Sequence, residues 1–82
     1  MPAADHELTL LTKPGCGLCG PARDAVARVH AATGVRWREV DVTTDAELEA
    51  EYAEKLPVVL LDGEEHDVYR VAEARLLRDV QR

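Results

Sequence analysis

The order of the elements predicted for the first half of the chain constrains the fold more than any other feature of the sequence. Glu7 to Thr12 is a short run rich in leucine and threonine that stops at Lys13-Pro14-Gly15, which predicts a buried strand. From Leu18 the apolar residues recur at helical spacing, and Val35 to Val42 is β-branched and aromatic, which predicts a helix and then a second strand. A strand, a helix and a strand in this order require a parallel pair joined by a right-handed crossover.

The helix boundaries are marked by short signals. The first helix is expected to carry Leu18, Ala22, Val26 and Val29 on one apolar face and to end at Gly34 with a left-handed cap.

A second helix is predicted by Thr44-Asp45-Ala46-Glu47, which matches a capping box with Thr44 as N-cap and Glu47 reaching back to it. We expect this helix to run to about Glu54, before the helix breaker Leu56-Pro57.

The last part of the chain predicts a hairpin and a third helix. Asp62-Gly63 between two extended runs is a strong signal for a two-residue hairpin turn, so strands are expected at Val58 to Leu61 and Glu64 to Tyr69. A helix from Ala72 to Val80 then turns Leu76, Leu77 and Val80 inward. The predicted order is strand, helix, strand, helix, strand, strand, helix. It gives a mixed four-stranded sheet with three helices on its two faces, the thioredoxin-like α/β fold.

Length and charge exclude several classes of function. Eighty-two residues allow one domain, expected to span residues 1–82. Ten Lys and Arg stand against sixteen Asp and Glu, a formal net charge of −6, and the scattered cations argue against nucleic-acid binding. The chain lacks the roughly 18 consecutive apolar residues that would cross a membrane, and its first residues do not resemble a signal peptide. We therefore expect a cytoplasmic monomer.

The two cysteines, Cys16 and Cys19, carry the strongest signal for chemistry. A bridge between residues three apart closes almost no chain, so it contributes little to global stability. A Cys-x-x-Cys beside a strand–helix–strand pattern is instead typical of a redox motif. We expect the helix N-terminus to stabilise a thiolate at Cys16, the exposed nucleophile, with Lys13 adding positive charge. Cys19, one turn deeper, is expected to be the buried resolving thiol.

Other roles for the cysteine pair stay open. The two thiols are inert in one alternative, and the chain is then an interaction module of the thioredoxin fold. In another they bind a metal or an iron–sulfur cluster. Zinc would need two more ligands, and His6, His30 and His66 are scattered, so no metal site and no cofactor are expected.

Pro21 leaves two starts for the first helix open. A helix that begins at Gly17 places Pro21 at its fifth position and must kink there. A helix that begins at Pro21, capped by Gly20, leaves both cysteines in a loop. We favour a short first turn followed by a kink.

Two segments resemble glutaredoxin-like proteins, and the element order extends the resemblance over nearly the whole chain. Leu10 to Cys19 resembles the family's active-site segment, and Leu56-Pro57-Val58-Val59 resembles the segment that carries its cis-proline. The resemblance implies that Pro57 is cis and faces the cysteines, and that the backbone of Leu56 hydrogen-bonds an extended substrate. It implies a thiol–disulfide oxidoreductase whose partner is a protein disulfide or a low-molecular-weight thiol.

Two departures from the family pattern argue against glutathione as that partner. Glutaredoxins that use glutathione usually carry a Gly-Gly pair and a polar N-cap before the last helix, whereas this chain has Val68-Tyr69-Arg70-Val71-Ala72-Glu73. The middle of the motif is Gly17-Leu18 instead of the common Pro-Tyr. Tyr69 and Arg70 either line a substrate groove beside Pro57 or pack at the strand end, and Lys13 is either a charge partner of Cys16 or a solvated loop lysine.

Overall fold

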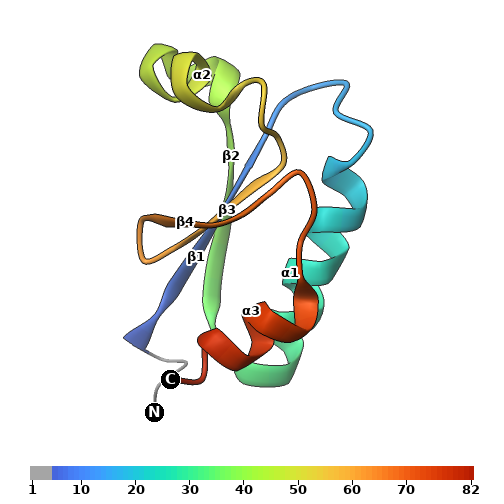
Figure 1. Ribbon diagram of the computed structural model, residues 1–82, viewed down its shortest axis with the longest axis vertical. Helices are drawn as coiled ribbons and strands as arrows, with labels where there is room; N and C mark the ends of the chain where they lie inside the picture. The colour runs from blue at the N-terminus through green and yellow to red at the C-terminus, as the bar shows by residue number, and fades with distance from the viewer. Residues whose placement is uncertain (1–4) are drawn as a thin grey trace.

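The chain folds in the order of elements that the sequence predicts. The computed structural model describes residues 5–82. Its elements are β1 (Glu7–Thr12), α1 (Cys19–Thr33), β2 (Arg36–Asp41), the 3-10 turn η2 (Val42–Thr44), α2 (Ala46–Tyr52), β3 (Val58–Leu61), β4 (Glu64–Val68) and α3 (Glu73–Asp79). The predicted thioredoxin-like α/β fold, with a mixed four-stranded sheet and three α-helices in the described residues, is confirmed (Figure 1).

The strand order brings two distant segments to one end of the sheet. The four strands lie in the order β2-β1-β3-β4. β1 is parallel to β2 and antiparallel to β3, and β3 is antiparallel to β4. Because Leu11 near the end of β1 pairs with Val58 at the start of β3, the loop after β1 and the loop before β3 are neighbours. The first carries Cys16 and the second carries Pro57.

The hairpin between β3 and β4 has the turn that its sequence predicts. Asp62 and Gly63 both have positive φ angles, 54° and 87°, as a two-residue turn of type I′ requires. Further along, Val59 pairs with Asp67 but Leu60 pairs with Glu65, which leaves His66 as an extra residue in a β-bulge. The bulge lets the side chains of both His66 and Asp67 contact α3.

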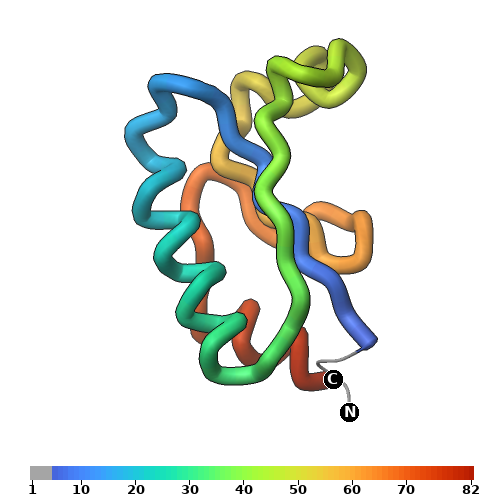
Figure 2. The backbone as a smooth tube through the Cα atoms, turned by 180° about the vertical axis from the view of Figure 1, so that it is seen from behind, coloured from blue at the N-terminus to red at the C-terminus, as the bar shows by residue number. Residues whose placement is uncertain are grey.

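Helices cover both faces of the sheet, as predicted. On one face α1 and α3 pack over Leu8, Leu10 and Val59 of the central strands, and Figures 1 and 2 show these two helices along the same side. On the other face a second cluster joins Leu11 and Val58 to residues from the α2 segment, among them Tyr52. The ends of β1 and β3 next to the cysteine loop are therefore buried, which makes them a rigid support for the loops there.

The start of α1 differs from the expectation. The helix begins at Cys19, with Leu18 as its N-cap, so neither of the two predicted starts is correct. Pro21 is then the third helical residue, where a backbone N–H would have no partner inside the helix, and it continues the helix without the predicted kink. Leu18 is 56% exposed and does not lie on the buried face, whereas Ala22, Val26 and Val29 do.

The capping box predicted for the second helix is also wrong by one residue. Thr44 belongs to η2, where its hydroxyl donates to the carbonyl of Asp41. Asp45 is the N-cap of α2 in its place, and its carboxylate accepts hydrogen bonds from the N–H groups of Glu47 and Leu48. The expected cap at Gly34 is confirmed, with a φ of 77°.

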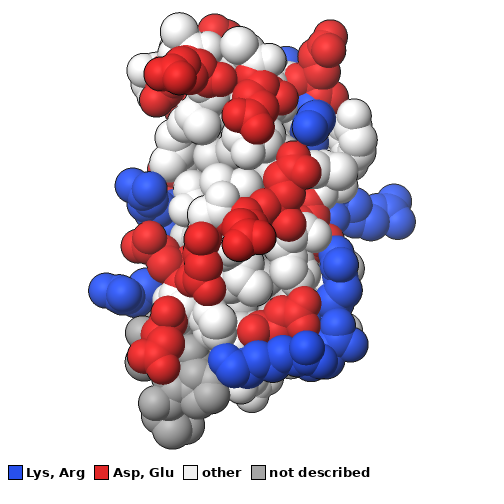
Figure 3. All heavy atoms as spheres, turned by 60° about the vertical axis from the view of Figure 1, so that its left-hand side comes forward, with Lys and Arg blue, Asp and Glu red and all other residues white. Residues whose placement is uncertain are grey.

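Acidic side chains dominate the face of the molecule shown in Figure 3. They extend from the α2 end at the top of that view, where Glu47, Glu49 and Glu51 are exposed, down across the molecule. Within residues 5–82, no helix has the length and apolar character needed to cross a membrane.

Candidate active site

Cys16 in the loop between β1 and α1 forms a disulfide with Cys19, the first residue of α1. Their Cα atoms are 5.5 Å apart. The loop is a single turn in which the N–H of Cys16 donates to the carbonyl of Lys13 and the N–H of Cys19 donates to the carbonyl of Cys16, each at 3.3 Å. Cys19 is buried, with 3% of its surface exposed, whereas Cys16 is partly exposed. The structure therefore distinguishes the two sulfur-bearing residues by solvent access.

The end of α1 points toward this disulfide. Leu18 provides no side-chain hydrogen bond at the N-cap, so the first N–H groups of the helix are not satisfied by a capping side chain. Since Cys16 precedes the helix by three residues and Cys19 is its first residue, the positive end of the helix dipole lies next to both.

Pro57 and Leu56 lie beside the cysteine loop. The Leu56–Pro57 peptide bond is cis and both residues are buried. Leu56 belongs to the core cluster on the α2 face, and Cys16 packs against that same cluster. The pairing of β1 with β3 thus brings together the two segments on which the family resemblance depends.

Lys13, the predicted charge partner of Cys16, is exposed and directs its ammonium group toward the end of α2. Its Nζ donates to the carbonyl of Ala53 over 3.4 Å. The carbonyl of Lys13 itself accepts the N–H of Cys16, so this residue contributes to the cysteine turn through its backbone.

Tyr69, the fourth predicted contact residue, is held beside Pro57 in a left-handed conformation. Its φ is 68°, which is uncommon for a residue with a large side chain, and the residue is 52% exposed. The backbone N–H of Tyr69 donates to the carbonyls of Pro57 (2.8 Å) and Lys55 (3.2 Å). A glycine would adopt this φ without strain, whereas this chain has a tyrosine here.

A groove of about 390 Å³ begins at Leu18, which lies between the two cysteines in the sequence, although neither cysteine lines the groove itself. One wall consists of Leu18, Pro21, Ala22 and Ala25 at the start of α1, and the other is the loop 69–71 between β4 and α3. Arg28 and Glu73 close one end with an ion pair of 2.8 Å. The sequence offered Tyr69 and Arg70 as residues of a substrate groove, and both line this one. The wall on α1 was missed, because Leu18 was assigned to the core.

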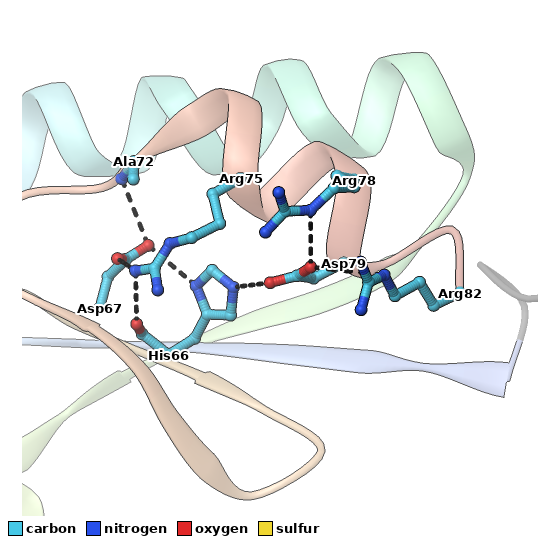
Figure 4. A network of polar contacts seen from close by, with 7 residues as sticks. All are labelled: His66, Asp67, Ala72, Arg75, Arg78, Asp79 and Arg82. Atoms are coloured by element: carbon cyan, nitrogen blue, oxygen red, sulfur yellow. Dashed lines mark hydrogen bonds and ion pairs between the residues drawn. The ribbon is translucent and has the colours of Figure 1, made fainter.

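A polar network under α3 anchors the loop that forms the second wall (Figure 4). The carboxylate of Asp67, nearly buried, accepts hydrogen bonds from the N–H of Ala72 (3.2 Å) and from the guanidinium of Arg75. His66 lies between two carboxylates, with Nδ1 3.0 Å from Asp67 and Nε2 2.7 Å from Asp79. The last strand and the start of α3 are thereby tied together across the loop.

A second ion pair lies one helical turn beyond Cys19. Arg23 donates to both oxygens of Glu39 on β2, at 2.6 and 2.7 Å, and the buried Thr12 donates to the same carboxylate at 2.9 Å. The hydrogen bonds from Arg23 hold the pKa of Glu39 below its ordinary value, helped by Thr12 and opposed by partial burial. The pair joins the start of α1 to the sheet behind the disulfide.

The described residues contain no arrangement suited to a metal ion. Among residues 5–82, no three His, Cys, Asp or Glu side chains gather in a way that would hold one.

Comparison with known proteins finds one matching family and relatives that share most of the chain. The model of a family described as a glutaredoxin-like domain (DUF836) matches residues 7–81. Two curated relatives, uncharacterized protein Mb0520 of Mycobacterium bovis and uncharacterized protein Rv0508 of Mycobacterium tuberculosis, are each 37% identical over 81 residues. Each match covers 93% of this chain and 84% of the relative.

Solved structures support the fold alone. Protein Ne2328 from Nitrosomonas europaea superposes with a TM-score of 0.74 at 15% identity, over 87% of this chain and 86% of its own. The oxidised form of mitochondrial thioredoxin 3 from Saccharomyces cerevisiae superposes with a TM-score of 0.68 at 17% identity, over 94% and 77%.

Proposed function

Because the chain belongs to the family of glutaredoxin-like domains (DUF836), we propose that it is a thiol–disulfide oxidoreductase that reduces disulfides of proteins or of low-molecular-weight thiols. The observation that carries the proposal is the Cys16–Cys19 disulfide at the start of α1, in which one cysteine is partly exposed and the other is buried. A redox function in general is supported by the family and by this disulfide together. The substrate and the order of the two cysteines are the proposal.

The reaction transfers two electrons from the reduced protein to the substrate disulfide. The Cys16 thiolate attacks one substrate sulfur, which breaks the substrate disulfide, forms a mixed disulfide and releases the other substrate sulfur as a thiolate that takes up a proton. Cys19 then loses its proton and attacks the Cys16 sulfur, which forms the intramolecular disulfide and releases the second substrate thiol. The protein ends oxidised, as in the structure, and a cellular thiol or dithiol reduces it again.

The surrounding residues support this order of attack. Partial exposure gives Cys16 access to a substrate, and the uncapped N-terminus of α1 favours a thiolate there. Leu56 and Pro57 lie next to the cysteine loop, where the backbone of Leu56 would hydrogen-bond an extended substrate, and Tyr69 flanks Pro57. Lys13 adds a positive charge to the same end of the molecule.

Single cysteine variants test the proposal. In Cys19→Ser the nucleophile remains but the resolving thiol is absent, so incubation with a disulfide substrate should accumulate a covalent adduct. Mass spectrometry should detect the added mass, and dithiothreitol should remove it. Cys16→Ser is the matched control and should form no adduct, because the buried Cys19 cannot reach the substrate.

Two other outcomes would contradict the proposal. An equal yield of adduct on both variants would mean two accessible thiols with no order. If the pair instead bound a metal or a cluster, the purified protein would absorb visible light or contain metal, both substitutions would abolish that metal, and neither would trap a substrate.

A further inference from the structure

The groove beside the disulfide is the place where this protein exposes large apolar side chains. In residues 5–82 the exposed large apolar residues are Leu18 at 56%, Tyr69 at 52% and Val68 at 36%, and the first two line the groove itself. Pro21, Ala22 and Ala25 extend the same apolar wall along α1. Apolar side chains gathered at one concave site, in a protein with a well-packed core elsewhere, indicate a surface that binds an apolar group.

The tyrosine wall is set in position before any ligand arrives. A left-handed φ of 68° is unfavourable for tyrosine, and it persists because the residue's N–H is held by two carbonyls and the loop beyond it is tied by Asp67 to Ala72. The backbone of Tyr69 therefore does not need to be ordered on binding, which lowers the entropic cost of a contact with this residue.

The groove also carries an unbalanced positive charge. Arg28 is neutralised by its ion pair with Glu73, whereas no carboxylate of residues 5–82 pairs with the guanidinium of Arg70, which lines the groove. The chain as a whole is acidic, with a formal net charge of −6. A ligand that places a carboxylate at Arg70 would therefore meet attraction there and repulsion over most of the remaining surface.

We propose that the groove binds the segment of a protein substrate that flanks its disulfide, and that it selects a bulky apolar residue next to the cysteine with an acidic residue close by. The inference rests on the proposed function and adds a substrate class to it; the thiol exchange is the one described above. Glutathione carries carboxylates for Arg70 but has no apolar side chain to fill the wall of Leu18 and Tyr69. The apolar contact is therefore what separates the two kinds of substrate.

Rates of oxidation of the reduced protein test this selection. The substrates are four peptide disulfides that differ in two positions, Leu or Gln next to the cysteine and Glu or Gln beyond it, together with glutathione disulfide. Hydroxyethyl disulfide, which has no side chains, serves as the reference. We expect the Leu/Glu peptide to react at least tenfold faster than the Gln/Gln peptide. The Glu contribution should be severalfold and should decrease as salt is added, because Arg70 is exposed.

Variants assign the preference to the groove. The preference is measured as the rate with the Leu/Glu peptide divided by the rate with the Gln/Gln peptide. Tyr69→Gly, which suits the positive φ and removes the ring, should lower this ratio severalfold, and Tyr69→Phe should retain it. Arg70→Gln should remove the Glu contribution, whereas Arg38→Gln, an exposed arginine on β2, should leave the ratio unchanged.

The outcomes distinguish this inference from the proposed function. Three results would each overturn the groove assignment: equal rates for the four peptides, a faster reaction with glutathione disulfide than with the Leu/Glu peptide, or a ratio that Tyr69→Gly does not change. Exchange with hydroxyethyl disulfide would in each case still support the oxidoreductase. A reduced protein that does not react even with hydroxyethyl disulfide would overturn both.

Discussion

Replacing Asp67 with asparagine tests whether the polar network under α3 stabilises the fold and holds the loop of the groove. The carboxylate accepts hydrogen bonds from the N–H of Ala72 and from the Arg75 guanidinium, and it lies 3.0 Å from Nδ1 of His66. Asparagine keeps the shape of the side chain and one acceptor oxygen, but it places an NH₂ donor where the second oxygen was. That donor then faces another donor, and the negative charge opposite Arg75 is lost.

The expected loss follows from the burial of the group. The side chain of Asp67 is 6% exposed, so its hydrogen bonds lie in a medium of low polarity. A hydrogen bond to a charged group contributes about 1.5–3 kcal/mol. Ala72 and His66 contact Oδ2 and Arg75 contacts Oδ1, so the amide oxygen of asparagine can serve only one side, and we assign the loss to the removed charge and to the side that faces the new NH₂ group. We expect the free energy of unfolding to fall by about 2–3 kcal/mol, a large share of the roughly 4–12 kcal/mol typical of a domain of this length.

Urea unfolding of the oxidised protein, followed by circular dichroism, measures this loss. Amide hydrogen exchange by NMR should also become faster at Ala72 and in the loop 69–71, since the tie across the loop is broken. Asp24→Asn, a change to an exposed carboxylate on α1, is the matched control and should shift stability by less than about 0.5 kcal/mol. A loss in Asp67→Asn no larger than that of the control would refute the reasoning.

Three further predictions concern stability and its dependence on pH. Gly34→Ala places a side chain at a φ of 77° with open space around it, so the cost comes from the backbone alone; urea unfolding should show a loss of about 1–2 kcal/mol, and a neutral result would mean that the helix end rearranges. Because the pKa of Glu39 is lowered, mainly by its hydrogen bonds from Arg23, its contribution to stability is present above the ordinary carboxyl pKa and is lost as the pH falls through the folded value. Glu39→Gln should therefore be less stable than the native protein at about pH 6, and this deficit should shrink as the pH falls; a deficit that is constant with pH would contradict the pairing. The pKa of His6 is raised, first by its hydrogen bond with Asp62 and next by the carbonyl of Arg82, so its contribution is present below its ordinary pKa and is lost as the pH rises through the folded value. His6→Gln should cost more stability at about pH 5.5 than at about pH 9, as measured by urea unfolding at the two pH values. A larger loss at pH 9 would contradict the pairing with Asp62.

The elements that the sequence predicted best are those with short, unambiguous boundaries. β1 and β3 begin and end at the predicted residues, because each is an apolar run enclosed by turn or breaker residues. The Asp62-Gly63 turn was predictable because a two-residue hairpin requires positive φ at both positions, and few dipeptides supply it. The cap of α2 was missed by one residue, because Thr44 and Asp45 are both good N-caps and only the preceding 3-10 turn decides between them.

The groove required the tertiary structure. Leu18 continues the apolar periodicity of α1, and only the actual start of the helix at Cys19 shows that it is exposed. His66 and Asp67 belong to a bulge, so the strict alternation of a strand would assign one of them to the wrong face. The left-handed φ of Tyr69 depends on carbonyl groups from the segment around Pro57, which no local pattern in the sequence reveals.

The pairing of β1 with β3 has a practical consequence for chemical labelling. The sequence contains two lysines, Lys13 and Lys55. One lies in the cysteine turn, and the carbonyl of the other accepts the N–H of Tyr69, so both stand at the end of the sheet that carries the disulfide. Dyes, cross-linkers and resins that react with these two side chains would therefore attach at the end of the sheet that carries the disulfide. The Asp62–Gly63 turn lies at the opposite end of the sheet. A tether attached there, by a reaction that does not use cysteine, would leave the disulfide facing away from the support.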